Sequence, residues 1–448
     1  MSLKQCWNLV PFNPAKIPFF YGWVIVFASI VGVLASSPGQ TTGVSTFTDH
    51  LIEFLNISRN HISTAYMIGT IGSSFLLTWA GQQYDRYGAR WTAMGASLLL
   101  AVVLVMLSQS DRIVGLFVDS RESASNTAVA FSLMILLFFL LRFSGQGVLT
   151  MVSRNMLMKW FIARRGFVNG IASVFITLGF SIAPLSYEWL ILETSWRWAW
   201  IIMAVAIGIG FLLFVFFLFR DNPEDLGMVP DGKKHAHRER NVTIRPFKQF
   251  TLKEARSTFP FWLFALPLAI YAQYITGFSF HLISIFETSG MDREMALAVF
   301  IPISFLSVVI SFVGGWISDR IKLKYLLYFV LTGEMIALLS LANLNADLFY
   351  YGFILGHGMA NGLYNVLMTV TWPRFYGRQH LGRITGFVMS LIVFSSAFGP
   401  VFFSFSYTRL GSYGYASLAL AVVVFILLIF AHKGINPQDK YPDNGSID

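Results

Sequence analysis

The sequence predicts an all-α integral membrane protein, with twelve transmembrane helices arranged as two pseudo-symmetric six-helix bundles. Three observations support this prediction: the composition, the number of long apolar segments and a motif that occurs twice. Of the 448 residues, 55% are hydrophobic and 12% are charged, and the mean hydropathy is +0.62. Soluble domains carry about 25% charged residues. The composition therefore excludes an ordinary soluble protein.

The apolar segments set the predicted helices and domains. A membrane-spanning helix needs about 20 mostly apolar residues. Twelve segments meet this criterion: residues 19–41, 61–82, 91–109, 128–151, 166–191, 197–219, 259–286, 295–317, 323–343, 346–371, 383–406 and 412–432. A polar, basic stretch follows the sixth segment. It predicts an N-terminal bundle over residues 1–219, a cytoplasmic linker over 220–257, and a C-terminal bundle with a short cytoplasmic tail over 258–448.

The basic residues predict the orientation in the membrane. With the N-terminus in the cytoplasm, most Lys and Arg residues fall on the cytoplasmic side, as the positive-inside rule requires. The exceptions are six outer residues and two at membrane depth: Arg59, Arg112, Arg121, Arg197, Arg293 and Arg409, then Arg142 and Arg154. We therefore expect both termini in the cytoplasm. The net charge of +9 then reflects topology and attraction to the inner leaflet, and no nucleic-acid partner is expected.

A short motif occurs once in each half, at the end of an even-numbered segment. Its members are Gly81, Asp85, Arg86, Gly88 and Arg90 in the first copy, and Gly315, Asp319 and Arg320 in the second. A constant offset of 216 residues also relates Gly166, Gly170 and Pro184 to Gly382, Gly386 and Pro400. Duplicated halves of this kind are typical of transporters. We interpret the motif as a conformational latch, in which the aspartate pairs with a basic group or a helix N-terminus. A role of its basic residues in topology alone is the alternative.

These features resemble the major facilitator superfamily along the whole chain. Residues 21–26 and 222–232 are similar to its bacterial branch near the monocarboxylate transporters and the oxalate/formate antiporters. The resemblance implies secondary active transport of a small, carboxylate-like organic anion by alternating access, coupled to protons or by exchange. One departure stands out, because Ser311 replaces the arginine that those transporters carry in the eighth helix. The usual carboxylate clamp is therefore missing.

Polar side chains within the apolar segments are candidates for function, because they are costly in a bilayer. Arg142 and Arg154 on the fourth segment can hold an anion by charge-assisted hydrogen bonds. Pairing of Arg142 with a loop acid, and an interface position for Arg154, are the structural alternatives. The complete set of expected substrate-binding residues is Arg142, Arg154, Asn155, Gln40, His281, Gln273, His357, Asn361, Tyr364 and Asn365.

Three residues are expected candidates for proton coupling: His281, Glu188 and Glu287. Glu334 on the ninth segment is a further candidate, although the ninth helix is usually peripheral in this fold. A histidine that only packs two helices is the alternative for His281. The polar stripe over residues 357–365 lines a pathway or bonds neighbouring helices. Pro38 interrupts the first segment, so we expect a kink with freed carbonyl groups there.

The sequence contains no phosphate-binding loop, no metal-ligand spacing and no feature of an enzyme. We therefore expect a transporter without cofactor or metal, whose partners are a small-molecule substrate, protons and the lipid bilayer. A monomer in the bacterial inner membrane is the expected state. Two alternatives stay open. One is an exporter or permease of a neutral amphipathic or siderophore-like metabolite, and the other is a transporter-like ligand sensor.

Overall fold

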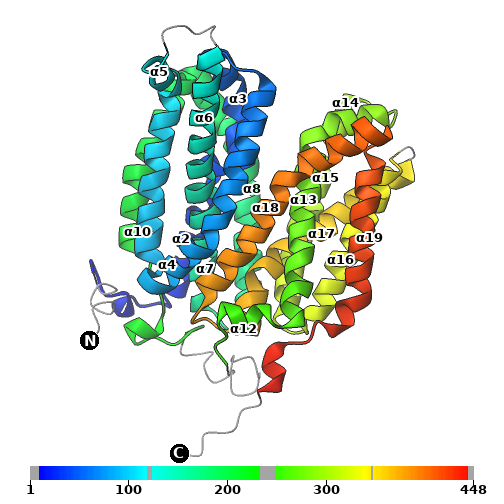
Figure 1. Ribbon diagram of the computed structural model, residues 1–448. Coiled ribbons are helices and arrows are strands. Elements are labelled where there is room, and N and C mark those ends of the chain that lie inside the picture. Colours follow the sequence, from blue (N-terminus) through cyan, green and yellow to red (C-terminus); the bar gives the residue numbers. More distant parts are fainter. Residues whose placement is uncertain (1–9, 119–123, 233–247, 345–346, 442–448) are drawn as a thin grey trace, which may run out of the picture. The chain divides into compact units, whose positions relative to one another are not determined.

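The computed structural model describes residues 10–118, 124–232, 248–344 and 347–441, and every regular element in these ranges is a helix (Figure 1). The basic part of the expected linker, with Lys233, Lys234, His235, His237, Arg238 and Arg240, lies outside the described residues. Contacts between residues divide the chain into two compact units. The predicted boundaries of the bundles and linker stay a prediction.

The first unit comprises residues 1–160, 175–237 and 385–390. Its elements include α2 (Gly22–Leu34), η2 (Ser37–Gly39), α3 (Thr41–Leu55), α4 (Arg59–Ser108), α5 (Ser110–Gly115), α6 (Ala124–Leu141), η3 (Arg142–Leu149), α7 (Thr150–Trp160), most of α8 (Arg165–Glu193), α9 (Trp196–Val205), η4 (Ala206–Phe211) and α10 (Leu212–Leu218). In Figure 1 these helices run from blue to green.

The second unit comprises residues 161–174, 238–384 and 391–448. Its elements include the start of α8, then α12 (Leu252–Arg256), α13 (Phe259–Thr288), α14 (Arg293–Ala298), α15 (Phe300–Ser318), α16 (Leu323–Ala342), α17 (Asp347–Tyr376), most of α18 (Leu381–Leu410) and α19 (Gly414–Phe430). Each unit therefore takes one short piece from the opposite half of the sequence, and both pieces belong to the helices α8 and α18 that the repeat relates.

All twelve predicted segments are helical. Ten helices in the described part of the chain are long and apolar enough to cross a membrane. One of them, α4, accounts for two predicted segments, because Gly88 interrupts it with φ of 84° and ψ of 178°. The remaining segment is α17, which is 30 residues long. It does not reach the required apolarity because several polar residues lie along it.

Two predicted helices are interrupted in the structure. The first ends at Leu34, forms the 3₁₀ turn η2 at Pro38, and resumes as α3, which continues to Leu55. Proline lacks the N–H that an α-helix needs, so the break falls where the sequence places Pro38. The fourth helix contains the π-helical stretch η3 between α6 and α7. Short π-helical stretches occur frequently at functional sites.

The repeat is visible in two close contacts between helix backbones. In the second unit, a Cβ atom added to Gly170 would lie 3.3 Å from the carbonyl oxygen of Ser311. In the first unit, a Cβ atom added to Gly386 would lie 2.4 Å from the carbonyl oxygen of Leu77. Gly170 and Gly386 are related by the offset within α8 and α18. Both units therefore use a glycine at an equivalent position to bring two helix backbones together.

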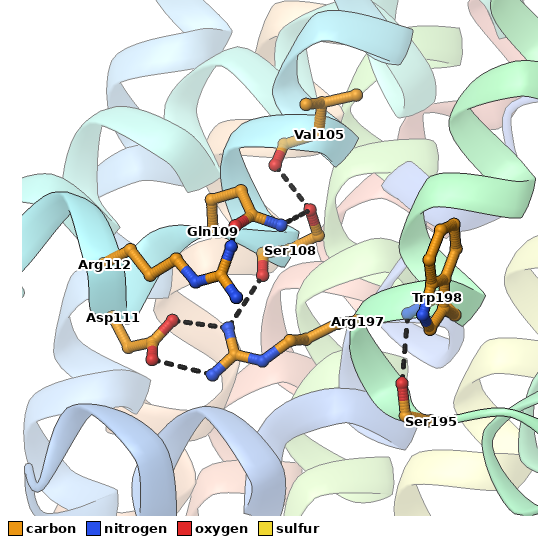
Figure 2. Close-up of polar contacts among 8 residues, drawn as sticks. All are labelled: Val105, Ser108, Gln109, Asp111, Arg112, Ser195, Arg197 and Trp198. Atoms are coloured by element: carbon orange, nitrogen blue, oxygen red, sulfur yellow. Dashed lines mark hydrogen bonds and ion pairs between the residues drawn. The ribbon is translucent and has the colours of Figure 1, made fainter.

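An ion pair joins α5 to α9 at one end of the first unit (Figure 2). The two guanidinium Nη atoms of Arg197 lie 2.5 and 2.7 Å from the two carboxylate oxygens of Asp111, and Nη1 also donates to the carbonyl oxygen of Ser108 at 3.0 Å. Burial raises the pKa of Asp111, but the hydrogen bonds from Arg197 outweigh burial and hold the pKa below its ordinary value. Since Arg197 is paired in this way, its contacts serve the structure of the unit.

Candidate functional site

Arg142 lies in η3 and is almost completely buried, with 3% of its surface exposed. Its Nη1 atom lies 3.1 Å from the carbonyl oxygen of Gly39 and 3.4 Å from Oγ1 of Thr41. The guanidinium carbon also lies 5.1 Å from the ring centre of Tyr66. Within the described part of the chain, the Nε atom of Arg142 has no hydrogen-bond partner. The partners are neutral, so the buried charge is not compensated by a carboxylate there.

The interruption between α2 and α3 supplies the backbone acceptor for Arg142. Carbonyl groups at a helix end have no partner within the helix. A Cβ atom added to Gly39 would lie 2.8 Å from Cα of Gly145 in η3. Because both positions are glycine, the broken helix can approach η3 closely enough for the freed carbonyl oxygen of Gly39 to reach the guanidinium.

Several hydroxyl and amide groups surround the same break. The side-chain oxygens of Ser36 and Thr150 are 3.1 Å apart, and Nε2 of Gln40 donates to Oγ of Ser36 at 3.1 Å. Oγ of Ser37 lies 2.5 Å from the hydroxyl oxygen of Tyr187 on α8. We call these residues the Arg142 cluster: Arg142, Ser36, Ser37, Gln40, Thr150 and Tyr187. It lies within the first unit.

Four residues at or beside this cluster were missed by the sequence reasoning: Tyr66, Gln146, Thr150 and Tyr187. Gln146 follows Arg142 by four residues, and its Oε1 atom is buried with no hydrogen-bond partner in the described residues. The spacing of Gln146 and Thr150 after Arg142 is a helical signal that the sequence contained. No comparable signal exists for Tyr66 and Tyr187, because they come from other helices.

Arg154 and Asn155 lie on α7, further along the same helical run. Arg154 is half-buried, and Asn155 is buried and donates from Nδ2 to Oγ1 of Thr385 at 2.7 Å. Arg142 and Arg154 are twelve residues apart, which corresponds to about 18 Å of helix rise. The two arginines are therefore separated by about three helical turns.

The expected polar stripe on α17 makes contacts with other helices. His357 is buried, its Nδ1 atom is hydrogen bonded to the hydroxyl of Tyr274, and its Nε2 atom lies 3.4 Å from the hydroxyl oxygen of Tyr271. Nδ2 of Asn361 donates to Oγ of Ser307 on α15 at 3.1 Å. His357 and Asn361 thus tie α17 to α13 and α15.

The other two members of the stripe lie beside these contacts. The ring of Tyr364 packs on that of Tyr271 with centroids 4.8 Å apart. Nδ2 of Asn365 lies 3.3 Å from the carbonyl oxygen of Asn361, within the same helix. Both side chains are half-buried. They therefore remain partly accessible, in contrast to His357.

The remaining candidates in the second unit are spread along α13. Nε2 of His281 donates to the carbonyl oxygen of Pro400 at 2.9 Å, a contact between α13 and α18. Gln273 lines a cavity of about 430 Å³ together with Phe394, Ser395, Phe398, Val401, Phe402 and Phe405. Glu287 at the end of α13 is exposed, as is Glu188 on α8 in the first unit.

In the second copy of the motif, Asp319 meets a helix N-terminus. Its two carboxylate oxygens accept from the backbone N–H groups of Gly166 at 2.8 Å and Phe167 at 2.9 Å, at the start of α8. Burial raises the pKa of Asp319 to about 6, and the two backbone hydrogen bonds oppose this shift. Arg320 is exposed and its guanidinium carbon lies 3.7 Å from the ring centre of Trp316.

In the first copy, Gly88 and Asp221 shape the turn. Gly88 has a positive φ, and a Cβ atom there would lie 1.8 Å from Oδ2 of Asp221, so the position requires glycine. Asp221, which sequence reasoning missed, accepts a hydrogen bond from the backbone N–H of Ala89. Arg90 is buried and donates from Nε to the carbonyl oxygen of Phe219 at 3.2 Å.

The other members of the first copy differ in exposure. Gly81 is buried, and a Cβ atom added to Gly386 would lie 3.3 Å from its Cα atom. Asp85 is half-buried and Arg86 is exposed, with its guanidinium carbon 5.2 Å from the ring centre of Tyr87. The latch role of both copies stays a prediction.

The raised pKa of Asp319 predicts a pH-dependent stability. Because the folded protein binds this proton more tightly than the unfolded chain, the contribution of Asp319 is fully present below about pH 3.8 and is lost as the pH rises through about 6. Asp319→Asn has no charge to bury. Its melting temperature relative to wild type should therefore rise between about pH 5 and about pH 7.5. The corresponding change in the free energy of unfolding has a ceiling of roughly 3 kcal/mol.

Tryptophan fluorescence of the purified protein in detergent measures both melting temperatures. Asp347→Asn, which removes an exposed carboxylate in the same unit, is the control and should show no such change. A difference between Asp319→Asn and wild type that is the same at both pH values would contradict the assignment.

The geometry thus far defines an all-helical, multi-pass membrane protein with a buried cationic site. The chain belongs to the Major Facilitator Superfamily, whose family model matches residues 19–400. It is therefore a secondary transporter and not an enzyme, and the predicted twelve-helix fold is confirmed.

Known proteins with sequence or structural similarity agree with this family. A probable sulfoacetate transporter, SauU of Cupriavidus necator, is 22% identical over 272 residues, which are 58% of this chain and 57% of that protein. The proton:xylose symporter XylE has a TM-score of 0.67 at 14% identity, with 95% of this chain and 98% of that chain covered.

Two further solved structures have the same fold. The fucose:proton symporter FucP of E. coli has a TM-score of 0.61 at 15% identity, covering 93% of this chain and 100% of that chain. The human organic anion transporter MFSD10 has a TM-score of 0.62 at 15% identity, covering 92% and 100%. At these identities the likeness concerns the fold.

Proposed function

We propose that this transporter moves a small organic anion bearing a carboxylate or sulfonate group, and that Arg142 binds the anionic group. The observation that carries the proposal is the burial of Arg142 with neutral partners only. A buried charge is normally paired, because desolvation without compensation is costly. A substrate anion is the partner that would compensate this charge.

The remaining groups of the Arg142 cluster suit recognition of such a substrate. Gln40 and Thr150 of the cluster, together with the adjacent Gln146, can donate to carboxylate or sulfonate oxygens. Charge-assisted hydrogen bonds from arginine are about twice as strong as neutral ones. The distant relative named as a probable sulfoacetate transporter supports the same class. Sulfoacetate carries both a carboxylate and a sulfonate group and therefore belongs to this class.

The proposal also covers the direction of transport and its energy source. We expect uptake or exchange by alternating access, driven by protons or by a second anion, in a bacterial inner membrane. A monomer with both termini in the cytoplasm is the proposed arrangement. Latch residues Asp85 and Asp319 would stabilise one conformation of the cycle.

A second candidate substrate class is a neutral amphipathic compound. The cavity beside Gln273 favours it, because four phenylalanines and one valine line this space of about 430 Å³. Ligand sites are commonly apolar cavities with a few polar groups. Gln273 and Ser395 would supply those polar groups.

A thermal-shift panel separates the two candidates. A ligand that binds only the folded protein raises its melting temperature by mass action. We expect shifts with sulfoacetate, short dicarboxylates or other small anions, and loss of these shifts in Arg142→Gln. Shifts with neutral amphipathic compounds alone would overturn the anion proposal and favour the second candidate.

A further inference from the structure

The second unit buries a carboxyl group that the proposed function does not use. Glu334 on α16 is 0% exposed, and neither carboxylate oxygen has a hydrogen-bond partner in the described residues. An ionised carboxylate in such surroundings is strongly disfavoured. Glu334 therefore carries a proton in this conformation. A neutral residue of the same size would fit there at no such cost. The presence of an acidic side chain at this position therefore requires an explanation.

Close helix packing fixes the place of this carboxyl group. A Cβ atom added to Gly333 would lie 3.0 Å from the carbonyl oxygen of Gly356, and one added to Gly356 would lie 2.7 Å from that of Gly333. The backbones of α16 and α17 therefore touch at these two glycines. Glu334 directly follows the first glycine, and His357 directly follows the second.

The titratable groups around Glu334 come from two helices. Tyr271 and Tyr274 on α13 lie close enough to interact electrostatically with the carboxyl group. On α17, His357 is bonded to both of these tyrosine hydroxyls, and Tyr364 stacks on Tyr271. The helices α15 and α19 and the 3₁₀ turn η7 (Ala431–Lys433) also pack on α16. Their only titratable side chains are Tyr415, His432 and Lys433, which are all exposed.

The hydrogen-bond inventory of His357 allows a proton to move through this group. A neutral imidazole has one N–H donor and one acceptor nitrogen. One tyrosine therefore donates to His357 and the other accepts from it. The donating tyrosine can give its hydroxyl proton to the acceptor nitrogen of His357 when its oxygen takes a proton from the neighbouring carboxylic acid.

We propose that Glu334 is the proton-binding site that couples the proton gradient to transport, with Tyr271 or Tyr274 connecting it to His357. The inference rests on the proposed function, whose driving ion it specifies. In the transfer step, the O–H bond of the Glu334 carboxylic acid breaks and a tyrosine oxygen takes the proton. The same tyrosine, the one that donates to His357, releases its own proton to the acceptor nitrogen of the imidazole, which leaves a carboxylate, a neutral tyrosine and an imidazolium.

This assignment also explains why polar residues at one end of the stripe over residues 357–365 on α17 are partly exposed. Tyr364, Asn361 and Asn365 are half-buried on the same helix as His357. Tyr364 contacts Tyr271 directly. A proton on the His357 side of the group is therefore close to the partly exposed side chains of α17.

The first test detects the proton itself and needs no substrate. Infrared spectroscopy of the purified protein should show the carbonyl stretch of a protonated carboxylic acid that disappears in Glu334→Gln and shifts in Glu334→Asp. The band should decrease as the pH is raised. Its absence, or a constant band over the whole pH range in which the protein stays folded, would overturn the proposal, since a permanently protonated group releases no proton to drive transport.

The second test uses proteoliposomes loaded with sulfoacetate. Glu334→Gln should retain exchange of labelled for unlabelled anion within about twofold, but should lose accumulation driven by a pH gradient by at least tenfold. Glu193→Gln, which removes an exposed carboxylate at the end of α8, should behave as wild type. Full gradient-driven accumulation by Glu334→Gln would overturn the proposal. Failure of the wild type to exchange any anion would instead count against the proposed substrate class, and the infrared titration would still decide on Glu334.

Discussion

Replacing Arg142 with glutamine is expected to weaken anion binding by roughly 30-fold to several thousandfold. Truncating one partner of a buried, hydrogen-bonded charge pair costs about 2–5 kcal/mol, and each 1.4 kcal/mol is about a factor of ten in affinity. Arg142→Lys should fall between wild type and Arg142→Gln, because it keeps the charge but loses the planar donor fork. Calorimetric titration with sulfoacetate measures both effects.

The stability of the unliganded protein gives a second readout for the same variant. A buried charge without an anionic partner carries a large desolvation cost, and a neutral side chain at the same position avoids this cost. We therefore expect Arg142→Gln to lower the stability of the empty protein by no more than about 1 kcal/mol. Arg59→Gln, which removes an exposed arginine paired with Asp49, is the control and should leave binding unchanged. A large loss of stability with unchanged binding would identify Arg142 as a structural residue.

Replacing Gly315 with valine is expected to reduce transport by at least tenfold and to lower the melting temperature by several degrees. A Cβ atom at this position would lie 2.4 Å from the carbonyl oxygen of Gly166. Because that atom belongs to the backbone, α15 and the start of α8 must separate, and the hydrogen bonds from Gly166 and Phe167 to Asp319 must lengthen. Overpacking of this kind typically costs about 1–3 kcal/mol.

Gly95→Ala is the matched control for this substitution. A Cβ atom at Gly95 meets nothing within 4 Å, so alanine should stabilise the helix by about 0.5–1 kcal/mol. Exchange of labelled substrate in proteoliposomes and melting curves in detergent measure the two variants together. Wild-type transport by Gly315→Val would contradict the role assigned to this contact.

Much of the fold follows from local features of the sequence. The apolar segments predicted all the long helices, because a membrane span must satisfy its backbone hydrogen bonds internally. Pro38 predicted the break in the first helix for an equally local reason. The offset between Gly170 and Gly386 predicted a repeat, and the equivalent backbone contacts of these glycines agree with it.

The site was less predictable, because its geometry depends on contacts between distant residues. Arg142 is visible in the sequence as a charge in an apolar segment, but its acceptor on Gly39 depends on the approach of two helices at Gly145. The π-helical form of η3 has no clear sequence signal. Tyr187 and Asp221 meet their partners across more than a hundred residues of chain.

The burial of Glu334 was also not predictable from the sequence. Sequence reasoning ranked it as a weaker candidate for proton coupling, because the ninth helix is usually peripheral. In the structure, α16 packs so closely on α17 at Gly333 and Gly356 that the carboxyl group is fully buried. A position on a peripheral helix therefore did not determine the direction in which this side chain points.

The central claim is that Arg142 binds the anionic group of the substrate. Exchange of labelled sulfoacetate in proteoliposomes, measured for wild type and for Arg142→Gln with a panel of unlabelled competitors, tests it most directly. We expect exchange by the wild type, competition by small carboxylates and sulfonates, and loss of exchange in the variant. Exchange that persists in Arg142→Gln, or uptake of neutral amphipathic compounds with no competition by any anion, would contradict the claim.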